Sequence, residues 1–374
     1  MPATPAVPGR KRPTLADVAT RTGVSVALAS IVMRGAKGAS AATRARVLRA
    51  AEELGYRPDT RARLLRSSRS RLLGVQFGLR HPFHTDLVEG IYAAAEPAGY
   101  QVALSAVAPS RGERQAVEAL LADRCEALIL LGPEVPAARL ADLAAQVPVV
   151  SVARRLRPAP PGVDVVRSAD DEGARQALEH LVALGHRAIV HIDGGRAPGA
   201  ADRRRGYRTA MNRHGLADHV RVLPGGLTEE DGAQAARTLL AEAPQPSAVL
   251  AFNDHCATGV LDAFLRAGVT VPDEVSVVGF DDTHLARLAH INLTTVAQDI
   301  PRLAELAVGR AIARLDGEAT PDRENVIPPR LVVRGTTAAP VTVRMGSAES
   351  AFRSAYGSRT STDSAGLSSR SSSP

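Results

Sequence analysis

The sequence predicts an all-α helix-turn-helix module over residues 14–58 and an α/β core over residues 72–337, built as two doubly wound parallel-sheet lobes. Short capped helical segments follow one another near the start of the chain. Beyond residue 72, apolar runs alternate with amphipathic stretches. The chain of 374 residues also exceeds the size at which one core stops growing, about 250 to 300 residues.

Both ends of the chain lack the apolar residues that a packed core needs. Residues 1–13 are proline-rich and end in the basic run Arg10, Lys11 and Arg12, so we expect a disordered basic arm. Residues 338–374 contain few large apolar residues, and eleven serines lie beyond residue 340. This composition predicts a disordered serine-rich tail.

Three short helices are predicted within residues 14–58. Thr14 and Asp17 resemble a capping box, which starts the first helix at about Leu15. The later signals are helix caps and terminating glycines at Gly23, Ser25, Ser40 and Gly55. The apolar residues expected to form the packing side of the second helix are Val24, Leu28, Ile31 and Val32. A tight glycine turn between the first two helices is typical of a helix-turn-helix.

A basic segment links this module to the core. Residues 59–71, together with the preceding Arg57, contain six arginines, whereas only Ala62, Leu64 and Leu65 are apolar. So few apolar residues cannot form a core helix, and we expect the segment to fold only when a partner binds it.

Charge is distributed unevenly along the chain. Residues 1–71 carry fifteen Lys and Arg against four Asp and Glu, whereas the remainder carries 31 against 35. A positive charge confined to one end is typical of a polyanion partner, most often nucleic acid. A basic face that is simply solvated remains the alternative.

Beyond residue 72, strand and helix patterns alternate. Apolar runs of strand length occupy residues 72–78, 100–107, 126–132, 147–152, 187–193, 247–252 and 274–280. Helical patterns occupy most of the gaps, for example residues 87–98, 173–184, 207–214, 254–267 and 303–315. Apolar strands separated by helices are typical of parallel sheets covered on both faces. The region is too long for one sheet, so we expect two lobes with a ligand cleft between them.

Several classes of protein are disfavoured by missing signals. Cys125 and Cys256 lie far apart without metal-ligand spacing, so neither a disulfide framework nor a metal site is predicted. The sequence contains no phosphate-binding glycine motif and no catalytic constellation, which argues against a cofactor and against an enzyme. It has neither a signal peptide nor an apolar run of membrane-spanning length, so we expect a cytoplasmic protein without a membrane partner.

Six segments together carry a family resemblance. They are TLADVATRTGVS (14–25), SAATRARVLRAAEELGYRPDTRARLLR (40–66), ALEHLVALGHRAI (177–189), AFNDHCATGVL (251–261), VPDEVSVVGFDD (271–282) and NLTTVAQD (292–299). In this order they resemble the lac-repressor (LacI/GalR-type) family of bacterial transcriptional regulators. The resemblance implies a periplasmic-binding-protein-like core and a homodimeric repressor that binds operator DNA, with affinity controlled by a small-molecule effector.

The resemblance also assigns the residues that would contact DNA. Val26 and Ala27 take the base-reading positions of the second helix, while Ile31 replaces an arginine that the family usually has there. Apolar residues can offer thymine contacts but no bidentate hydrogen bonds. The resemblance further implies that residues 59–71 fold as a hinge helix on operator DNA, in which Leu65 matches a leucine that the family wedges into the minor groove. The other expected DNA-contacting residues are Thr14, Ser25, Ser30, Arg34, Lys37, Arg44, Arg61 and Ala62.

Effector-binding positions follow in the same way. The matching residues are Phe83, His84, Arg154, Arg203, Phe252, Asn253, Asp254, Asp281 and Gln298. Paired Asp and Arg groups beside an amide suit the vicinal hydroxyls of a sugar. With no Trp, stacking would fall to Phe83 or Phe252, so another small polar ligand remains open. For Asp254, capping of the following helix is an equal alternative.

Two rival functions remain at this point. A two-lobed core also resembles that of solute-binding proteins, which would have no DNA role. A carbohydrate-active enzyme is the third hypothesis, although no paired acids can be placed in the sequence for that chemistry.

Overall fold

The computed structural model describes residues 13–33, 35–56, 69–318 and 322–340. The chain divides into two compact units, Met1–Ser70 and Arg71–Pro374, and each is described by itself. We call them the head and the core. The predicted basic arm lies outside the described residues up to residue 12, and so does the predicted tail beyond residue 340. Of the predicted hinge helix, only residues 69–71 are described, and they are not helical.

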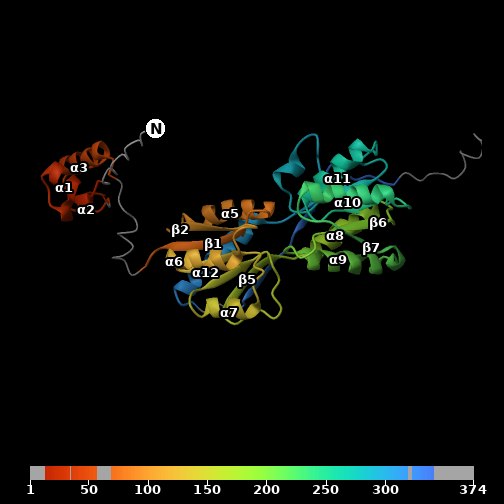
Figure 1. Ribbon diagram of the computed structural model, residues 1–374, viewed down its shortest axis with the longest axis horizontal. Coiled ribbons are helices and arrows are strands. Elements are labelled where there is room, and N and C mark those ends of the chain that lie inside the picture. Colours follow the sequence, from red (N-terminus) through yellow and green to blue (C-terminus); the bar gives the residue numbers. More distant parts are fainter. Residues whose placement is uncertain (1–12, 34, 57–68, 319–321, 341–374) are drawn as a thin grey trace, which may run out of the picture. The chain divides into compact units, whose positions relative to one another are not determined.

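The head contains the three predicted helices, α1 (Leu15–Thr22), α2 (Val26–Met33) and α3 (Ala41–Leu54) (Figure 1). The predicted capping box is confirmed, because the Thr14 side chain accepts from the Asp17 N–H and the Asp17 carboxylate accepts from the Thr14 N–H. Ser25 and Ser40 also accept hydrogen bonds from the first turns of their helices, as predicted. The glycine after α1 and the glycine after α3 adopt the left-handed conformation.

The packing side of α2 differs in part from the prediction. Ala29 and Val32 are the buried residues of this helix, whereas Leu28 and Ile31 are only half-buried. The core of the head consists of Val18, Ala19, Ala29, Val32, Val47 and Ala51. Small residues let these short helices approach closely. For this reason Ala29 is buried at the contact, where the apolar pattern predicted Leu28 and Ile31.

The core consists of two lobes, of which the N-lobe carries a six-stranded sheet. Its elements are β1 (Leu72–Gly78), α5 (Pro82–Ala95), β2 (Gln101–Val107), α6 (Glu113–Ala122), β3 (Ala127–Leu131), α7 (Ala137–Ala144), β4 (Val149–Val152), β5 (Val163–Ser168), α12 (Ile300–Leu315) and β11 (Glu324–Ile327). The strand order is β11-β5-β4-β3-β1-β2, and all pairs are parallel. Leu128 and Leu130 pack with α6 and α7 on one face, while Ile129 and Leu131 pack with α5 and α12 on the other.

The C-lobe is built around a parallel sheet of order β7-β6-β8-β9. Its elements are α8 (Asp170–Ala183), β6 (Ile189–Asp193), α9 (Ala200–Arg213), η1 (Ala217–His219), β7 (Arg221–Pro224), α10 (Glu229–Ala241), β8 (Ala248–Leu250), α11 (Asp254–Arg266), β9 (Ser276–Val278), η2 (His284–Arg287), β10 (Thr295–Ala297) and β12 (Arg330–Val332). Helices α8 and α9 cover one face, and α10 and α11 cover the other. The antiparallel pair β10–β12 was not predicted.

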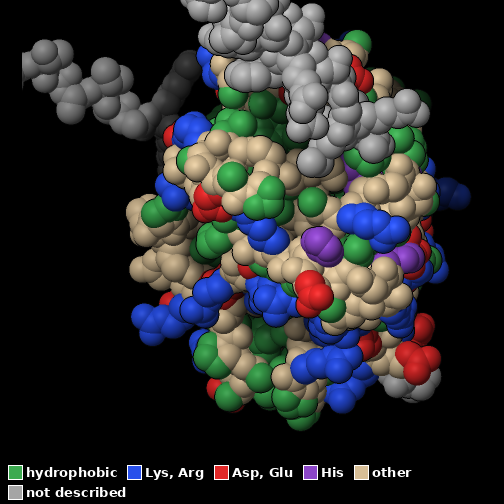
Figure 2. Space-filling view, turned by 90° about the vertical axis from the view of Figure 1, so that its right-hand side faces the viewer, with side chains coloured by type: hydrophobic (Ala, Val, Ile, Leu, Met, Phe, Trp, Pro, Cys, Tyr) green, Lys and Arg blue, Asp and Glu red, His purple; other side chains and the backbone are tan. Residues whose placement is uncertain are grey.

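The chain passes between the lobes three times. It enters the C-lobe after β5, returns after β10 to add α12 and β11 to the N-lobe, and ends with β12 in the C-lobe (Figure 1). The Ala338 N–H donates to Ser276 Oγ at 3.1 Å, so the folded core reaches one residue beyond the predicted end at 337. The end of the core that carries α10 and α11 has interspersed basic and acidic side chains (Figure 2).

Candidate functional site

The start of α2 presents small and apolar side chains to solvent. Val26 is 50% exposed, and Ala27 is also exposed. Ile31 is half-buried and packs at the edge of the helix, with its Cγ2 close to the position of Gly38. This face can make apolar contact with base edges, but Val26, Ala27 and Ile31 provide no hydrogen-bond donors for guanine.

The predicted phosphate-contacting residues of the head occupy different environments. Thr14 is exposed and engaged in its cap, and Lys37 is exposed. Arg44 donates through Nη2 to the Ala36 carbonyl at 2.6 Å, which holds the loop between α2 and α3. Ser25 is exposed at the start of α2, and Ser30 is half-buried within it. Four further predicted residues, Arg34, Arg61, Ala62 and Leu65, lie outside the described residues.

A pocket between the lobes of the core brings together seven of the nine predicted effector-binding residues. They are Phe83, His84, Arg203, Phe252, Asn253, Asp281 and Gln298. Most of its residues follow the carboxyl ends of strands, where open parallel sheets bind their ligands. The cavity volume is about 30 Å³, enough for one or two water molecules and too small for a sugar.

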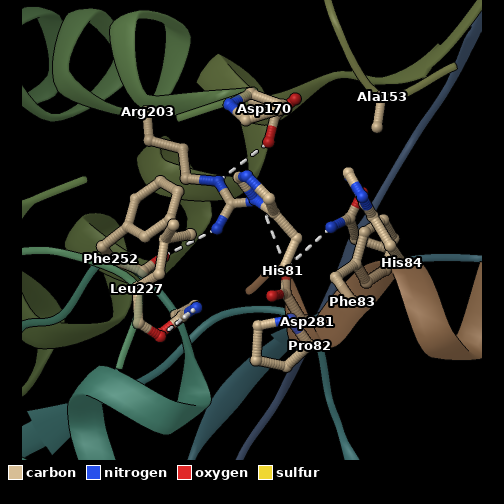
Figure 3. Close-up of a pocket in the computed structure, with 13 residues that line it drawn as sticks. His81, Pro82, Phe83, His84, Ala153, Asp170, Arg203, Leu227, Phe252 and Asp281 are labelled. Atoms are coloured by element: carbon tan, nitrogen blue, oxygen red, sulfur yellow. Dashed lines mark hydrogen bonds and ion pairs between the residues drawn. The ribbon is translucent and has the colours of Figure 1, made fainter. Parts of the chain in front are cut away.

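Arg203 of α9 is the centre of a buried network in this pocket (Figure 3). Its Nε donates to Asp170 Oδ1 at 2.8 Å, its Nη2 to Asp281 Oδ1 at 3.1 Å, and its Nη1 to the Phe252 carbonyl at 2.6 Å. The guanidinium carbon also lies 3.6 Å from the ring centroid of Phe280. One cation therefore ties α8, the end of β8 and the loop after β9 together.

Asp281 is held in an unusual state. Burial raises the pKa of its carboxyl to about 6, although Arg203 and Gln298 favour the charged form. Its φ of 108° lies in a region that non-glycine residues rarely occupy, and such strain clusters at ligand sites. The hydrogen bonds from Arg203 and Gln298 both reach Oδ1, so Oδ2 is left to accept from a ligand. Burial also raises the pKa of Asp170.

The N-lobe side of the pocket is formed by the start of α5, including His81 and His84 (Figure 3). The two imidazole rings stack with centroids 4.6 Å apart. His84 Nδ1 accepts from the Gly78 N–H at 3.0 Å, and burial lowers the pKa of His84 well below its usual value. This ring is therefore neutral and carries its proton on Nε2.

Two predicted effector-binding residues lie outside this pocket. The Arg154 side chain lines a neighbouring cavity, where its Nη2 donates to the Arg196 carbonyl at 3.1 Å. Asp254 is fully buried behind the pocket and accepts from the Thr283 N–H and from Thr295. The alternative that Asp254 caps α11 is wrong, because Asn253 caps this helix by accepting from the Cys256 N–H.

Six pocket residues were missed by the sequence reasoning: His81, Pro82, Ala153, Asp170, Pro198 and Leu227. Asp170 had a usable signal, because it is the first of three consecutive acidic residues at the start of α8, directly after an apolar strand. His81 precedes the predicted Phe83 by two residues, and Leu227 had no signal of its own.

Neither a metal site nor a simple membrane span is found in the described part of the chain. Within residues 13–33, 35–56, 69–318 and 322–340, no group of His, Cys, Asp and Glu side chains is arranged to hold a metal ion. No single helix there has the length and apolar character to cross a membrane. Helices α1 and α2 meet those criteria only as a pair, across a bend of 108°.

Comparison with known proteins places the chain in a family. Residues 14–59 match bacterial regulatory proteins of the lacI family, and residues 178–337 match a periplasmic binding protein-like domain. The HTH-type transcriptional regulator GalR of Escherichia coli (strain K12) is 33% identical over 333 residues, covering 87% of this chain and 96% of GalR. The chain belongs to the lacI family of bacterial regulatory proteins. The predicted family and fold class are thereby confirmed.

Solved structures of relatives agree with this assignment. The lac repressor dimer bound to operator and an anti-inducer has a TM-score of 0.75 and 31% identity, covering 88% of this chain and 100% of that one. The complex of the regulator CelR with cellobiose has a TM-score of 0.62 and 30% identity, covering 87% and 100%. This lacI-family chain is a DNA-binding transcriptional regulator, as predicted.

Proposed function

We propose that the chain is a homodimeric repressor whose affinity for operator DNA is set by a carbohydrate bound between the lobes of its core. The observation that carries this proposal is the buried Arg203 network, in which Asp170 and Asp281 each use Oδ1 for the guanidinium. Carboxylate oxygens that remain beside a fixed cation suit the hydroxyl groups of a sugar. The cellobiose complex of CelR, a relative, also supports a sugar ligand.

The size of the pocket implies a conformational change. A cavity of about 30 Å³ does not admit a sugar, so the lobes must separate, or His81 and Phe252 must move, before one binds. A ligand that favours one arrangement of the lobes changes the equilibrium between arrangements, and operator affinity follows. Linkage then requires operator DNA to change sugar affinity by the same factor.

The remaining parts of the proposal concern location and chemistry. The protein acts in the cytoplasm, where operator DNA is accessible, and it performs no catalysis on its ligand. Val26 and Ala27 contact the bases through their apolar side chains. Arg44 and Lys37 follow α2 in the head and add positive charge that attracts the DNA phosphates. The rival solute-binding role would leave the basic head without a partner.

The experiment begins with operator and ligand identification. Sequencing of DNA fragments that co-purify with the full chain gives the operator, and a calorimetric screen of hexoses and disaccharides gives the sugar. Gel-shift titration with and without that sugar, and calorimetry with and without operator, then measure the same coupling twice. Equal sugar affinity in the presence and absence of operator would refute the allosteric proposal.

Two variants test whether DNA binding depends on the head and sugar binding on the pocket of the core. Deletion of residues 1–71 is expected to abolish DNA binding and leave sugar binding intact, whereas a pure solute-binding protein would show no DNA binding even before deletion. Asp281→Asn removes the buried charge with little change of shape, and we expect at least a tenfold loss of sugar affinity. Unchanged affinity in this variant would remove Asp281 from the site.

A further inference from the structure

A second and larger cavity lies beside the pocket and shares none of its lining residues. Its volume is about 580 Å³. It is lined by residues that follow β3, β4 and β6 and by the first turn of α9, so three carboxyl ends of parallel strands converge there. We propose that this cavity is a separate site for an anion, the phosphoryl group of a small molecule.

The lining of this cavity is basic. Four arginines, Arg154, Arg155, Arg157 and Arg196, line it together with two acids, Glu134 and Asp202. The lining residues by themselves therefore carry a net charge of +2, and two further acids interact with them from outside the lining, Asp171 with Arg155 and Glu113 with Arg154. Arginine forms paired hydrogen bonds to phosphate oxygens, and a group of them within one cavity selects for anions.

One donor in this lining has no partner among the described residues. Arg154 Nε is buried and has no hydrogen-bond partner, although its side chain is 24% exposed through other atoms. Its Nη2 lies 3.4 Å from Glu134 Oε1, a weak contact. A buried donor without a partner costs free energy, so the present arrangement of Arg154 is not its most favourable one.

Arg157 and Arg196 supply further free charge. Both are exposed, and neither forms an ion pair within the described ranges of the chain. Arg155, in contrast, is committed to Asp202 at 3.0 Å and to Asp171 at 3.5 Å. The positive charge available to an anion therefore comes mainly from Arg154, Arg157 and Arg196. Arg155 holds Asp202 and Asp171 in place at the side of the cavity.

The start of α9 adds a favourable dipole. This 14-residue helix begins after Gly199, which lines the cavity and provides no side-chain cap for the first turn. The N-terminal end of a helix carries a partial positive charge that stabilises bound anions. The dipole reinforces the arginine charge at the same position.

The donors come from both lobes. Arg154 and Arg157 follow β4 of the N-lobe, whereas Arg196 and Gly199 follow β6 of the C-lobe. An anion bound to both sets would relieve repulsion among the arginines and hold the lobes in the arrangement described above. The site would thus act on the same conformational equilibrium as the sugar without occupying the sugar pocket.

Calorimetric titration of the full chain tests the proposal. Inorganic phosphate, a hexose 6-phosphate and the same hexose without phosphate are compared at pH 8 and constant ionic strength. The variants are Arg154→Gln and the double variant Arg157→Gln/Arg196→Gln. The control is Arg237→Gln, an exposed residue of α10 whose partner is Gln234 on the same helix. We expect saturable binding of phosphate or of the sugar phosphate, at least tenfold weaker in both variants and unchanged in the control.

The outcomes distinguish free phosphate from a phosphorylated sugar as the ligand, and the second cavity from the sugar pocket as the site. Binding of inorganic phosphate alone supports a free phosphate ligand, and tighter binding of the hexose phosphate supports a phosphorylated metabolite. Asp281→Asn, chosen to impair the sugar pocket, is expected to retain saturable binding of inorganic phosphate. The proposal is overturned if neither phosphate compound binds saturably, if both arginine variants retain wild-type affinity, or if Asp281→Asn loses phosphate binding.

Discussion

Replacing Arg203 by methionine tests how strongly the buried network stabilises the core. The side chains of Arg203, Asp170 and Asp281 are 5 to 6% exposed, so the variant leaves two buried carboxylates without their cation. Breaking a buried ion pair in this way costs about 3–5 kcal/mol. We expect the free energy of unfolding to fall by about that amount at pH 7 and not by twice as much, because protonation of Asp281, with its pKa of about 6, relieves part of the penalty.

The matched control is Arg205→Met on the same helix. Arg205 also pairs with two carboxylates, Asp171 and Asp202, but its side chain is 45% exposed and Asp202 keeps Arg155 as a partner. Pairs of this kind contribute about 0–1 kcal/mol. Urea unfolding followed by far-ultraviolet circular dichroism at pH 7 measures both variants. The reasoning is refuted if the two substitutions cost the same, or if Arg203→Met costs under about 1 kcal/mol.

Three further predictions concern other parts of the chain. Burial, with Asp281 nearby, raises the pKa of Asp254 to about 8, so the folded state retains a proton that the unfolded state releases. The free energy of unfolding should therefore fall as pH rises from about 4 to 8, and urea titrations of Asp254→Asn should show a flatter dependence on pH. A pH dependence like that of the wild type in this variant would contradict the prediction. In Gly206→Ala the new methyl would meet the Asp171 carbonyl, so we expect a loss of about 1–3 kcal/mol, whereas Gly309→Ala on α12 meets nothing and should stabilise by about 0.5–1 kcal/mol, as thermal unfolding can measure. Ile31→Arg should shift the preferred bases towards guanine by about 1–3 kcal/mol at one position, read by selection and sequencing of bound DNA; an unchanged site would make Ile31 a packing residue only.

Local signals in the sequence were sufficient for the head and for most strands. The caps at Thr14 and Ser40 depend on a few neighbouring residues, and both were predicted correctly. Strand β1 was predicted with its observed bounds because its centre is buried and its run of residues is mostly apolar. In contrast, β11 alternates between exposed and buried residues at a sheet edge and pairs with a strand about 160 residues earlier, so no local pattern revealed it.

The candidate site was predictable to the extent that its residues lie at strand ends. Arg203, Asp281 and Gln298 were named from sequence and meet in the pocket. Arg154 instead lines the second cavity, where its Nη2 donates to the Arg196 carbonyl, a contact between residues 42 positions apart that no local pattern reveals. Asp254 does not line the pocket, because the loop after β9 packs against it through a long-range hydrogen bond from the Thr283 N–H.

The threefold passage of the chain between the lobes has a consequence for synthesis. Strand β5 of the N-lobe gains its outer neighbour only when β11 has left the ribosome, after nearly all of the C-lobe has emerged. The three helices of the head need no later residue for their own hydrophobic cluster. On a translating ribosome the head can therefore fold early, while the N-lobe remains incomplete until β11 has emerged. A truncated message would yield a folded head without a ligand-responsive core.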